Sequence, residues 1–176
     1  MIIDNTYFNN NILPLGSFEV SNSRNGEGVA HKSIAINFSI SVYEPKYLKE
    51  LMGSELYAEY VDTKSDSKWT VLIDKLRNVE TKRSPIANYV YFYHRRDNAI
   101  AKGDNGDFVP KTDNMQSVSI NQRMRIAWDD MVSQNEDLMR WIYNSVINTD
   151  SPAIETTASW DMACWDRLLT EQGGLW

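Results

Sequence analysis

The clearest periodic pattern of apolar and polar positions lies in the middle of the chain. Residues 84–98 read SPIANYVYFYHRRDN, and apolar side chains recur there at the three- and four-residue spacing of a helix face. Ser84 and Pro85 are typical of a helix N-terminus, and the basic run after Tyr93 suits a C-terminal turn. Because apolar residues occur on nearly every side, the pattern predicts a central helix with neighbours on several sides.

Further helical patterns lie on both sides of this segment. Before it, we predict helices that begin at Pro45, at Ser54 and near Trp69, with Gly53 ending the first of them. After it, the longest pattern covers residues 120–146, with a possible bend at 133–135. The predicted core consists of large apolar side chains on the inward faces of these helices: Leu48, Leu51, Leu56, Tyr89, Tyr91, Phe92, Trp128, Met131 and Trp141.

Residues 33–42 show a different period. Apolar and polar residues alternate strictly there, which is typical of a strand with one buried face. Its partner would be residues 14–21 or a strand of another subunit. The predicted fold is therefore a mainly α protein: a helical bundle of four to five helices with a small β element and extended N- and C-terminal arms.

The two arms and a polar loop are the predicted contact regions. We divide the chain into an N-terminal arm (1–32), a helical domain (33–148) and a C-terminal arm (149–176). A short Trp-rich helix is marginal alone, so the C-terminal arm must dock on its own domain or, as we favour, on a neighbouring chain. The polar loop at 102–117 is expected to be mobile in the free protein and to contact a neighbour after assembly. The predicted partner contacts are Phe108, Trp160, Trp165, Leu168 and Trp176.

Composition and charge narrow the function without identifying a reaction. The single cysteine, Cys164, excludes an internal disulfide framework, and no apolar run reaches the about 18 residues of a membrane span. The net charge of −6 divides into −4 for residues 1–66, +5 for residues 67–125 and −7 for residues 126–176. A basic middle between acidic ends favours pairing with copies or protein partners over coating nucleic acid.

The sequence contains no recognisable catalytic motif. It has two histidines, His31 and His94, and neither belongs to a Cys/His cluster, a phosphate-binding loop or a nucleophile elbow. We therefore expect no catalytic residue, no metal ligand and no cofactor. Two alternatives stay open: a cytosolic helical enzyme whose site includes His94, Arg95 and Arg96, and an accessory protein that binds nucleic acid through the basic middle third.

Three segments, in order along the chain, resemble the signatures of one phage family. Residues 43–57, YEPKYLKELMGSELY, resemble its YL-x-x-LLG-x-x-LY stretch. Residues 84–98 match its second signature, and residues 118–131 match a third, usually VSP…K-MVRAWNEM. The family consists of head–tail connector proteins, also called adaptor or neck ring proteins, of tailed phages of Bacteroidetes, crAss-like phages included.

This resemblance implies a structural virion protein. The family's helical domain is repeated, commonly twelvefold, in a homo-oligomeric ring beneath the portal protein, and it joins the portal to other neck or tail proteins. Genomic DNA would pass through the channel without sequence-specific binding, and no membrane would be involved. The protein would be made in the bacterial host cytoplasm and would reside in the virion neck. Such a protein acts through its surfaces, which agrees with a sequence that lacks catalytic motifs.

Overall fold

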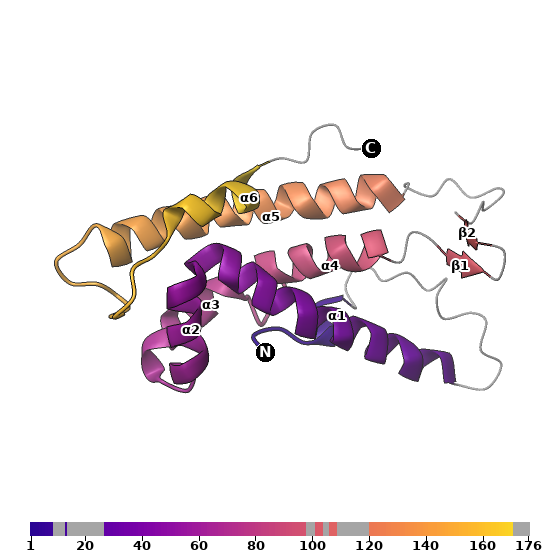
Figure 1. Ribbon diagram of the computed structural model, residues 1–176, viewed down its shortest axis with the longest axis horizontal. Coiled ribbons are helices and arrows are strands. Elements are labelled where there is room, and N and C mark those ends of the chain that lie inside the picture. The colour runs from indigo at the N-terminus through magenta and orange to yellow at the C-terminus, as the bar shows by residue number, and fades with distance from the viewer. Residues whose placement is uncertain (9–12, 14–26, 98–100, 104–105, 109–119, 171–176) are drawn as a thin grey trace.

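A computed structural model of the chain describes residues 1–8, 13, 27–97, 101–103, 106–108 and 120–170. Within these residues the protein is a mainly helical bundle (Figure 1), as the sequence predicts. The α-helices are α1 (Glu27–Met52), α2 (Ser54–Thr63), α3 (Thr70–Leu76), α4 (Pro85–Asp97), α5 (Ile120–Ile142) and α6 (Asp166–Leu169). Short 3-10 turns occur at Asn5–Phe8, Ser67–Trp69 and Met162–Trp165, and a π-turn at Tyr143–Ile147 extends α5.

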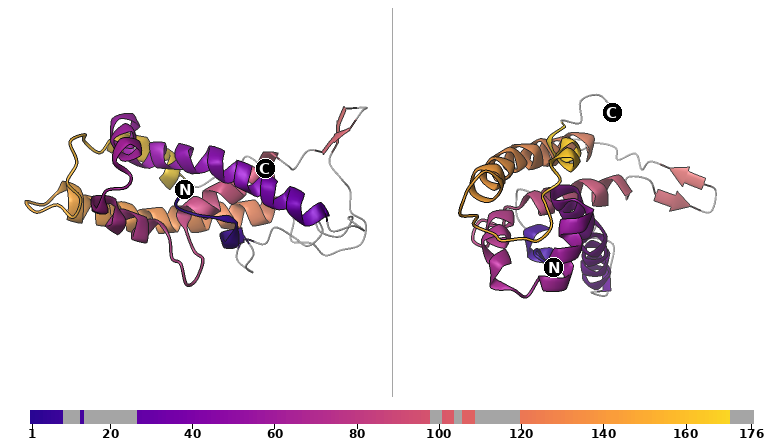
Figure 2. Two further views of the ribbon diagram at one scale, coloured as in Figure 1. Left: turned by 90° about the horizontal axis from the view of Figure 1, so that it is seen from below. Right: turned by 60° about the vertical axis from the view of Figure 1, so that its left-hand side comes forward.

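Helix α4 forms the centre of the bundle, with α5 on one side and α1 on the other (Figures 1 and 2). Every residue from Pro85 to Phe92 is buried. The Ser84 hydroxyl accepts a hydrogen bond from the backbone N–H of Ala87 at 3.4 Å and donates one to the carbonyl oxygen of Leu76 at 2.7 Å. The predicted central helix is therefore confirmed together with its capping residue.

The strand predicted over residues 33–42 is wrong, because this segment lies within α1. Ile36 and Ile40 are buried one helical turn apart, which is compatible with both a strand face and a helix face. Phe38 and Val42, assigned to the same buried strand face, are instead 69% and 43% exposed. Pro45, predicted to begin a helix, lies inside α1. The alternating pattern therefore predicted a strand where the chain forms a helix, because two apolar side chains of this helix lie outside the core.

The described chain contains one β element, a hairpin of β1 (Ala101–Gly103) and β2 (Gly106–Phe108). The strands are antiparallel, with Ala101 opposite Phe108 and Gly103 opposite Gly106. The hairpin falls within the segment predicted to be a loop. The side chain of Phe108 and the loop residues from 109 onward lie outside the described part of the chain, so the predicted contact of this loop with a neighbour stays a prediction.

The junction between α1 and α2 depends on a glycine. Gly53 has a φ of +81°, a backbone conformation that favours glycine, as predicted. A Cβ atom at this position would lie 2.6 Å from the Cβ of Asp161. The close approach allows the segment before α6 to pass over the α1–α2 turn.

The first residues of the predicted N-terminal arm pack into the core. Glu44 of α1 accepts hydrogen bonds from the backbone N–H groups of Ile2 at 2.8 Å and Ile3 at 3.1 Å. Burial raises the pKa of the Glu44 carboxyl, although these hydrogen bonds act in the opposite direction. The four buried apolar side chains at this end are at most 5% exposed: Ile2, Ile3, Tyr7 and Phe8.

Helix α5 is continuous through residues 133–135, where the sequence indicated a possible bend. Asn135 is fully buried, and its side chain joins two other elements. The hydroxyl of Tyr47 donates to Asn135 Oδ1 at 2.5 Å, and Asn135 Nδ2 donates to the carbonyl oxygen of Leu168 at 3.0 Å. A residue that looks like a weak point in a helix therefore connects α1, α5 and α6.

Candidate interaction surfaces

The predicted core residues lie in the interior and build the scaffold. Eight of them are 4% exposed or less: Leu48, Leu51, Leu56, Tyr89, Tyr91, Phe92, Trp128 and Met131. The ninth, Trp141, is partly buried against them. The rings of Phe92 and Trp128 lie 4.6 Å apart between centroids and connect α4 to α5. These aromatic side chains stabilise the bundle and are not available to a partner.

The C-terminal arm docks on its own chain. Trp165 is 8% exposed, and its Nε1 donates a hydrogen bond to the carbonyl oxygen of Leu51 at 2.7 Å. Leu168 is fully buried. Both side chains therefore pack within their own chain, whereas the sequence favoured docking of this arm on a neighbouring chain. Trp160 is partly buried against the same core, and Trp176 lies outside the described residues.

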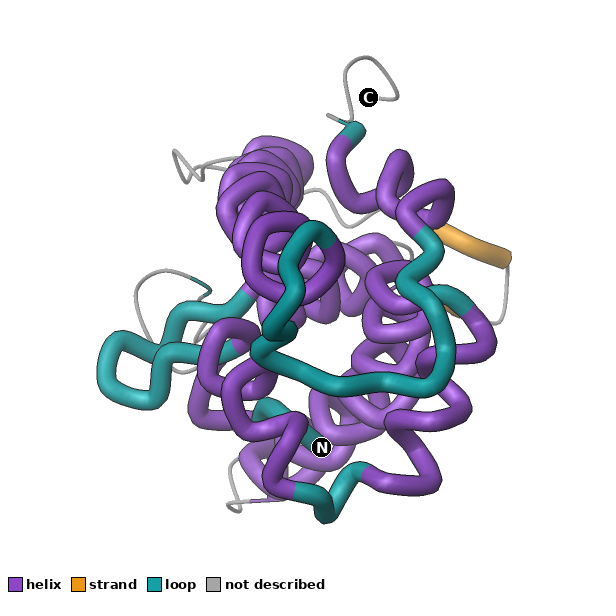
Figure 3. The backbone as a smooth tube through the Cα atoms, turned by 90° about the vertical axis from the view of Figure 1, so that its left-hand side faces the viewer, coloured by secondary structure: helices purple, strands orange, loops and turns teal. Residues whose placement is uncertain are grey.

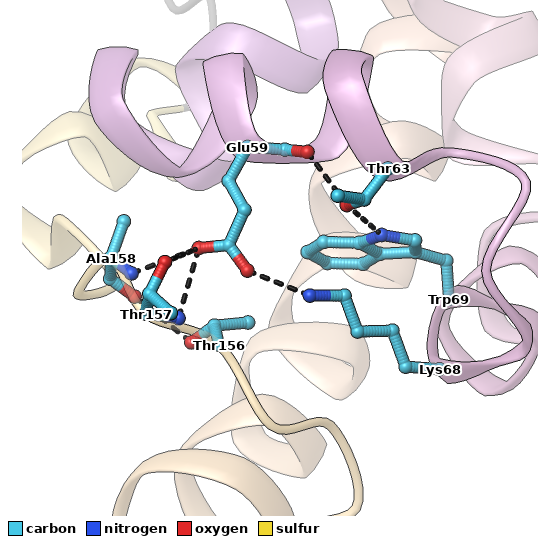
Figure 4. A network of polar contacts seen from close by, with 7 residues as sticks. All are labelled: Glu59, Thr63, Lys68, Trp69, Thr156, Thr157 and Ala158. Atoms are coloured by element: carbon cyan, nitrogen blue, oxygen red, sulfur yellow. Dashed lines mark hydrogen bonds and ion pairs between the residues drawn. The ribbon is translucent and has the colours of Figure 1, made fainter.

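A loop of residues 148–161, the returning loop, brings α6 back from the end of α5 across the end of the bundle (Figure 3). Glu59 of α2 holds this loop (Figure 4). Its carboxylate accepts hydrogen bonds from Thr157 N and Ala158 N, both at 2.9 Å, and from Thr157 Oγ1 at 2.8 Å. Lys68 Nζ lies 2.7 Å from the other carboxylate oxygen. Lys68, followed by these hydrogen bonds, lowers the pKa of Glu59 to about 2.

The three residues of the enzyme alternative take part in packing. His94 is 5% exposed, and its Nδ1 lies 2.9 Å from the hydroxyl of Ser39 on α1. The Arg95 guanidinium lies 5.3 Å from the ring centroid of Tyr91. Arg96 lies 4.4 Å from the ring centroid of a tyrosine on α4 and forms an ion pair at 3.1 Å with its neighbour Asp97.

A polar hollow lies between α1, α4, α5 and α6. It is lined by Lys46, Glu50, Tyr93, Trp128, Asp166, Arg167 and Thr170. Glu50 accepts a hydrogen bond from the Tyr89 hydroxyl at 3.0 Å and lies 3.7 Å from Arg167. Lys46 lies 4.4 Å from the ring centroid of Tyr93. The lining contains two cations and two carboxylates, so the hollow does not favour a ligand of either sign.

Metal and thiol chemistry find little support in the described residues. Among them, no group of three or more His, Cys, Asp or Glu side chains is placed to hold a metal ion. The hydrogen bond between Cys164 Sγ and Asp161 Oδ2, at 3.1 Å, raises the pKa of the thiol and disfavours the reactive thiolate. None of the described helices is both long and apolar enough to cross a membrane.

Exposed apolar side chains gather on the outer face of α1. Phe38 and Val42 lie one turn apart, and the partly buried Pro45 and the exposed Lys49 continue the same face. We call these four residues the α1 stripe. Figure 1 shows that α1 diverges from α4 toward its N-terminal end, whereas the stripe lies in the middle and C-terminal part of the helix.

A second apolar surface is a shallow groove between the end of α5 and the segment around α6. It is lined by Glu136, Met139, Arg140, Tyr143, Trp165 and Leu169, which we call the α5–α6 groove. Met139 and Trp165 are 3% and 8% exposed and form its floor, whereas Tyr143 is 45% exposed. Glu136 and Arg140 are exposed and form a charged rim. An apolar floor with a polar rim is the usual anatomy of a protein interface.

Neither surface was predicted from the sequence. Phe38 and Val42 were assigned to a buried strand face, and Trp165 was assigned to the docking face of the C-terminal arm, not to the floor of a groove. The available signal was the spacing of Phe38, Val42 and Pro45, which also fits one face of a helix. In comparisons with known proteins, no family model, curated protein or solved structure matches this chain.

Proposed function

We propose that the protein is a structural subunit of a phage virion that forms an oligomeric ring in the neck. The ring joins the portal to tail components and leaves a channel for DNA. The observation that carries this proposal is the α1 stripe, with Phe38 69% and Val42 43% exposed on one helix face. Single exposed apolar residues are common, but adjacent large ones on one face favour a contact with another protein.

The resemblance to head–tail connector proteins supports the same function. Its three segments correspond to the helices that build the bundle: the end of α1 with α2, then α4, then the first part of α5. Two of these helices, α4 and α5, share the aromatic contact between Phe92 and Trp128. The residues that carry the resemblance are therefore the residues that position the rest of the chain.

The state of the basic residues also favours a protein contact over nucleic-acid binding. Arg83 forms an ion pair at 2.8 Å with Asp130, and Arg96 forms one with Asp97. Lys82 lies 5.1 Å from the ring centroid of Tyr7. Several charges of the basic middle third are therefore already used within the chain, which reduces the number available to phosphate groups. Among the residues that the structure describes, the contacts of His94, Arg95 and Arg96 are with side chains of their own chain.

The proposal is tested by measuring assembly. The mass of the purified protein should be determined by light scattering after size exclusion, alone and with the portal protein of the same phage. We expect a ring-sized assembly or a stable complex with the portal, and electron microscopy of that fraction should show a ring with an open channel. A protein that stays monomeric and does not bind the portal would contradict the proposal. Salt-dependent binding to DNA without assembly would favour the nucleic-acid alternative.

A further inference from the structure

We propose that the α1 stripe of one copy docks into the α5–α6 groove of the next copy. This inference rests on the proposed function, because it names the contact that would join neighbouring subunits of the ring. The occupant of the groove is thus a second copy of this chain. The following observations on shape, charge and position carry it.

The apolar part of the stripe, from Phe38 to Pro45, matches the groove in length and character. Phe38 and Pro45 are seven residues apart on α1, and Glu136 and Tyr143 are seven residues apart along α5 and its π-turn. At a rise of ~1.5 Å per residue, each of these distances is about 10 Å. The stripe is an apolar ridge, and the groove has an apolar floor of methionine and tryptophan. Methionine adapts its shape to a neighbouring ring, which suits a protruding phenylalanine.

Each surface carries an exposed charge that suits the other. Lys49 is the exposed charge of the stripe, whereas Lys46 lines the polar hollow and Glu44 of the same helix is buried. The groove lies in the most acidic third of the chain, and Glu136 is exposed on its rim. Pairing of Lys49 in one copy with Glu136 in the next favours one orientation, because the other end of the rim carries Arg140, which would repel Lys49.

The positions of the two surfaces make the contact directional. Helices α1 and α5 lie on different sides of α4 (Figure 1). Each copy can therefore offer its stripe to one neighbour and its groove to another. A head-to-tail contact of this kind closes into a ring when the rotation between copies fits, and otherwise extends into a filament.

Cross-linking between two variants tests the contact even when it is weak. In a Cys164→Ser background, a Phe38→Cys chain and a Tyr143→Cys chain carrying different tags are mixed and mildly oxidised. The expected result is a disulfide between the two chains, formed in clear excess over a matched mixture of Val79→Cys with Tyr143→Cys. Val79 is a suitable control because it is an exposed apolar residue, 58% accessible, outside both surfaces. Equal yields in the two mixtures would overturn the inference, and so would preferential linkage of Phe38→Cys to itself.

Charge reversal provides a second test with its own rescue. Lys49→Glu and Glu136→Lys should each weaken self-association about tenfold, and the double variant should regain it, since every head-to-tail contact then contains the swapped pair. Failure of the double variant to recover would contradict the charge arrangement. Portal binding and ring formation are scored separately. A ring without the cross-link overturns this inference alone, whereas a cross-link without a ring or portal binding overturns the proposed function alone.

Discussion

Glu59 should make the stability of the bundle depend on acid in a predictable way. Its side chain is 12% exposed, and its carboxylate is bonded to Lys68, Thr157 and the backbone N–H of Ala158. Replacing it with glutamine keeps the size of the side chain and removes the charge that all of these donors share. At neutral pH, the Glu59→Gln variant should therefore hold the returning loop less tightly than the wild-type protein.

The size of the stabilisation by the Glu59 carboxylate and its dependence on pH follow from the pKa of that group. A lowering from 4.5 to about 2 corresponds to ~3 kcal/mol between the two protonation states. Because the carboxylate lies near the surface, solvent and salt reduce this to about 1–2 kcal/mol. Since the folded pKa is below the unfolded value, the stabilisation is present above pH ~4.5 and is lost as the pH falls toward 2. Burial raises the pKa of Glu44, so this carboxyl favours the folded state as the pH falls. The effect is the same in the wild-type protein and in Glu59→Gln.

Urea unfolding at several pH values between 7 and 2.5 measures the difference between the two proteins. We expect Glu59→Gln to be less stable by about 1–2 kcal/mol at pH 7 and nearly equal to wild type at pH 2.5. Glu155→Gln, in the exposed part of the same returning loop, is the control and should differ by less than about 0.5 kcal/mol at every pH. A Glu59→Gln deficit that stayed constant across this range would refute the assigned role of the charge.

Three further substitutions test the scaffold and the outer surface. Phe92→Ala should lower the free energy of unfolding by about 3–5 kcal/mol, because it removes a ring that is 4% exposed in the core; a loss below ~1 kcal/mol would remove this part of α4 from the core. Asn135→Ala should cost about 2–3 kcal/mol in the same urea assay, because the hydroxyl of Tyr47 and the carbonyl of Leu168 would lose their buried partner; an unchanged value would show that water replaces the amide. Phe38→Asp should change unfolding by less than about 0.5 kcal/mol, since the side chain is exposed, yet reduce assembly in light scattering. Full assembly of that variant would exclude the stripe from the subunit contact.

The central helix could be predicted from sequence because its signals are local. Ser84 and Pro85 mark its start within two residues, and the basic residues mark its last turn. The apolar residues on its several faces required several neighbours, and the structure supplies them in α1 and α5. The end of α1 at Gly53 could be predicted for the same reason, because glycine readily adopts the positive φ that is found there.

Helix α1 could not be predicted because its pattern fits two periods. Ile36 and Ile40 lie on one face in a strand and also in a helix. The two assignments differ at Phe38 and Val42, which are exposed, and at Ser39, which is buried. A sequence rule that buries apolar residues chooses the strand. The rule fails where an apolar side chain stays exposed, so the error coincides with the candidate interaction surface.

The fold-back of the C-terminal arm depends on contacts with no local signal. Thr157 reaches Glu59 across 98 residues, and the Trp165 indole reaches the Leu51 carbonyl across 114. Composition identified the tryptophans as residues that must be covered, but it did not identify what covers them. The partner of a short marginal helix is a property of the whole fold.

The burial of Trp165 and Leu168 and the exposure of Phe38 indicate which side chains would stabilise a contact between subunits. Trp165 and Leu168 are already buried, so they stabilise the free subunit and add little when subunits meet. Phe38 is still exposed, and covering it would contribute about 1.5–3 kcal/mol per contact. That is too little to hold two copies together at low concentration once the cost of association is subtracted. In a closed head-to-tail ring, however, every subunit has a contact on each side, so removing one subunit breaks two contacts. In the proposed ring, weak individual contacts would leave the subunit monomeric on its own. They would retain it once a portal brings the copies together, because the second contact of each subunit forms at high effective concentration.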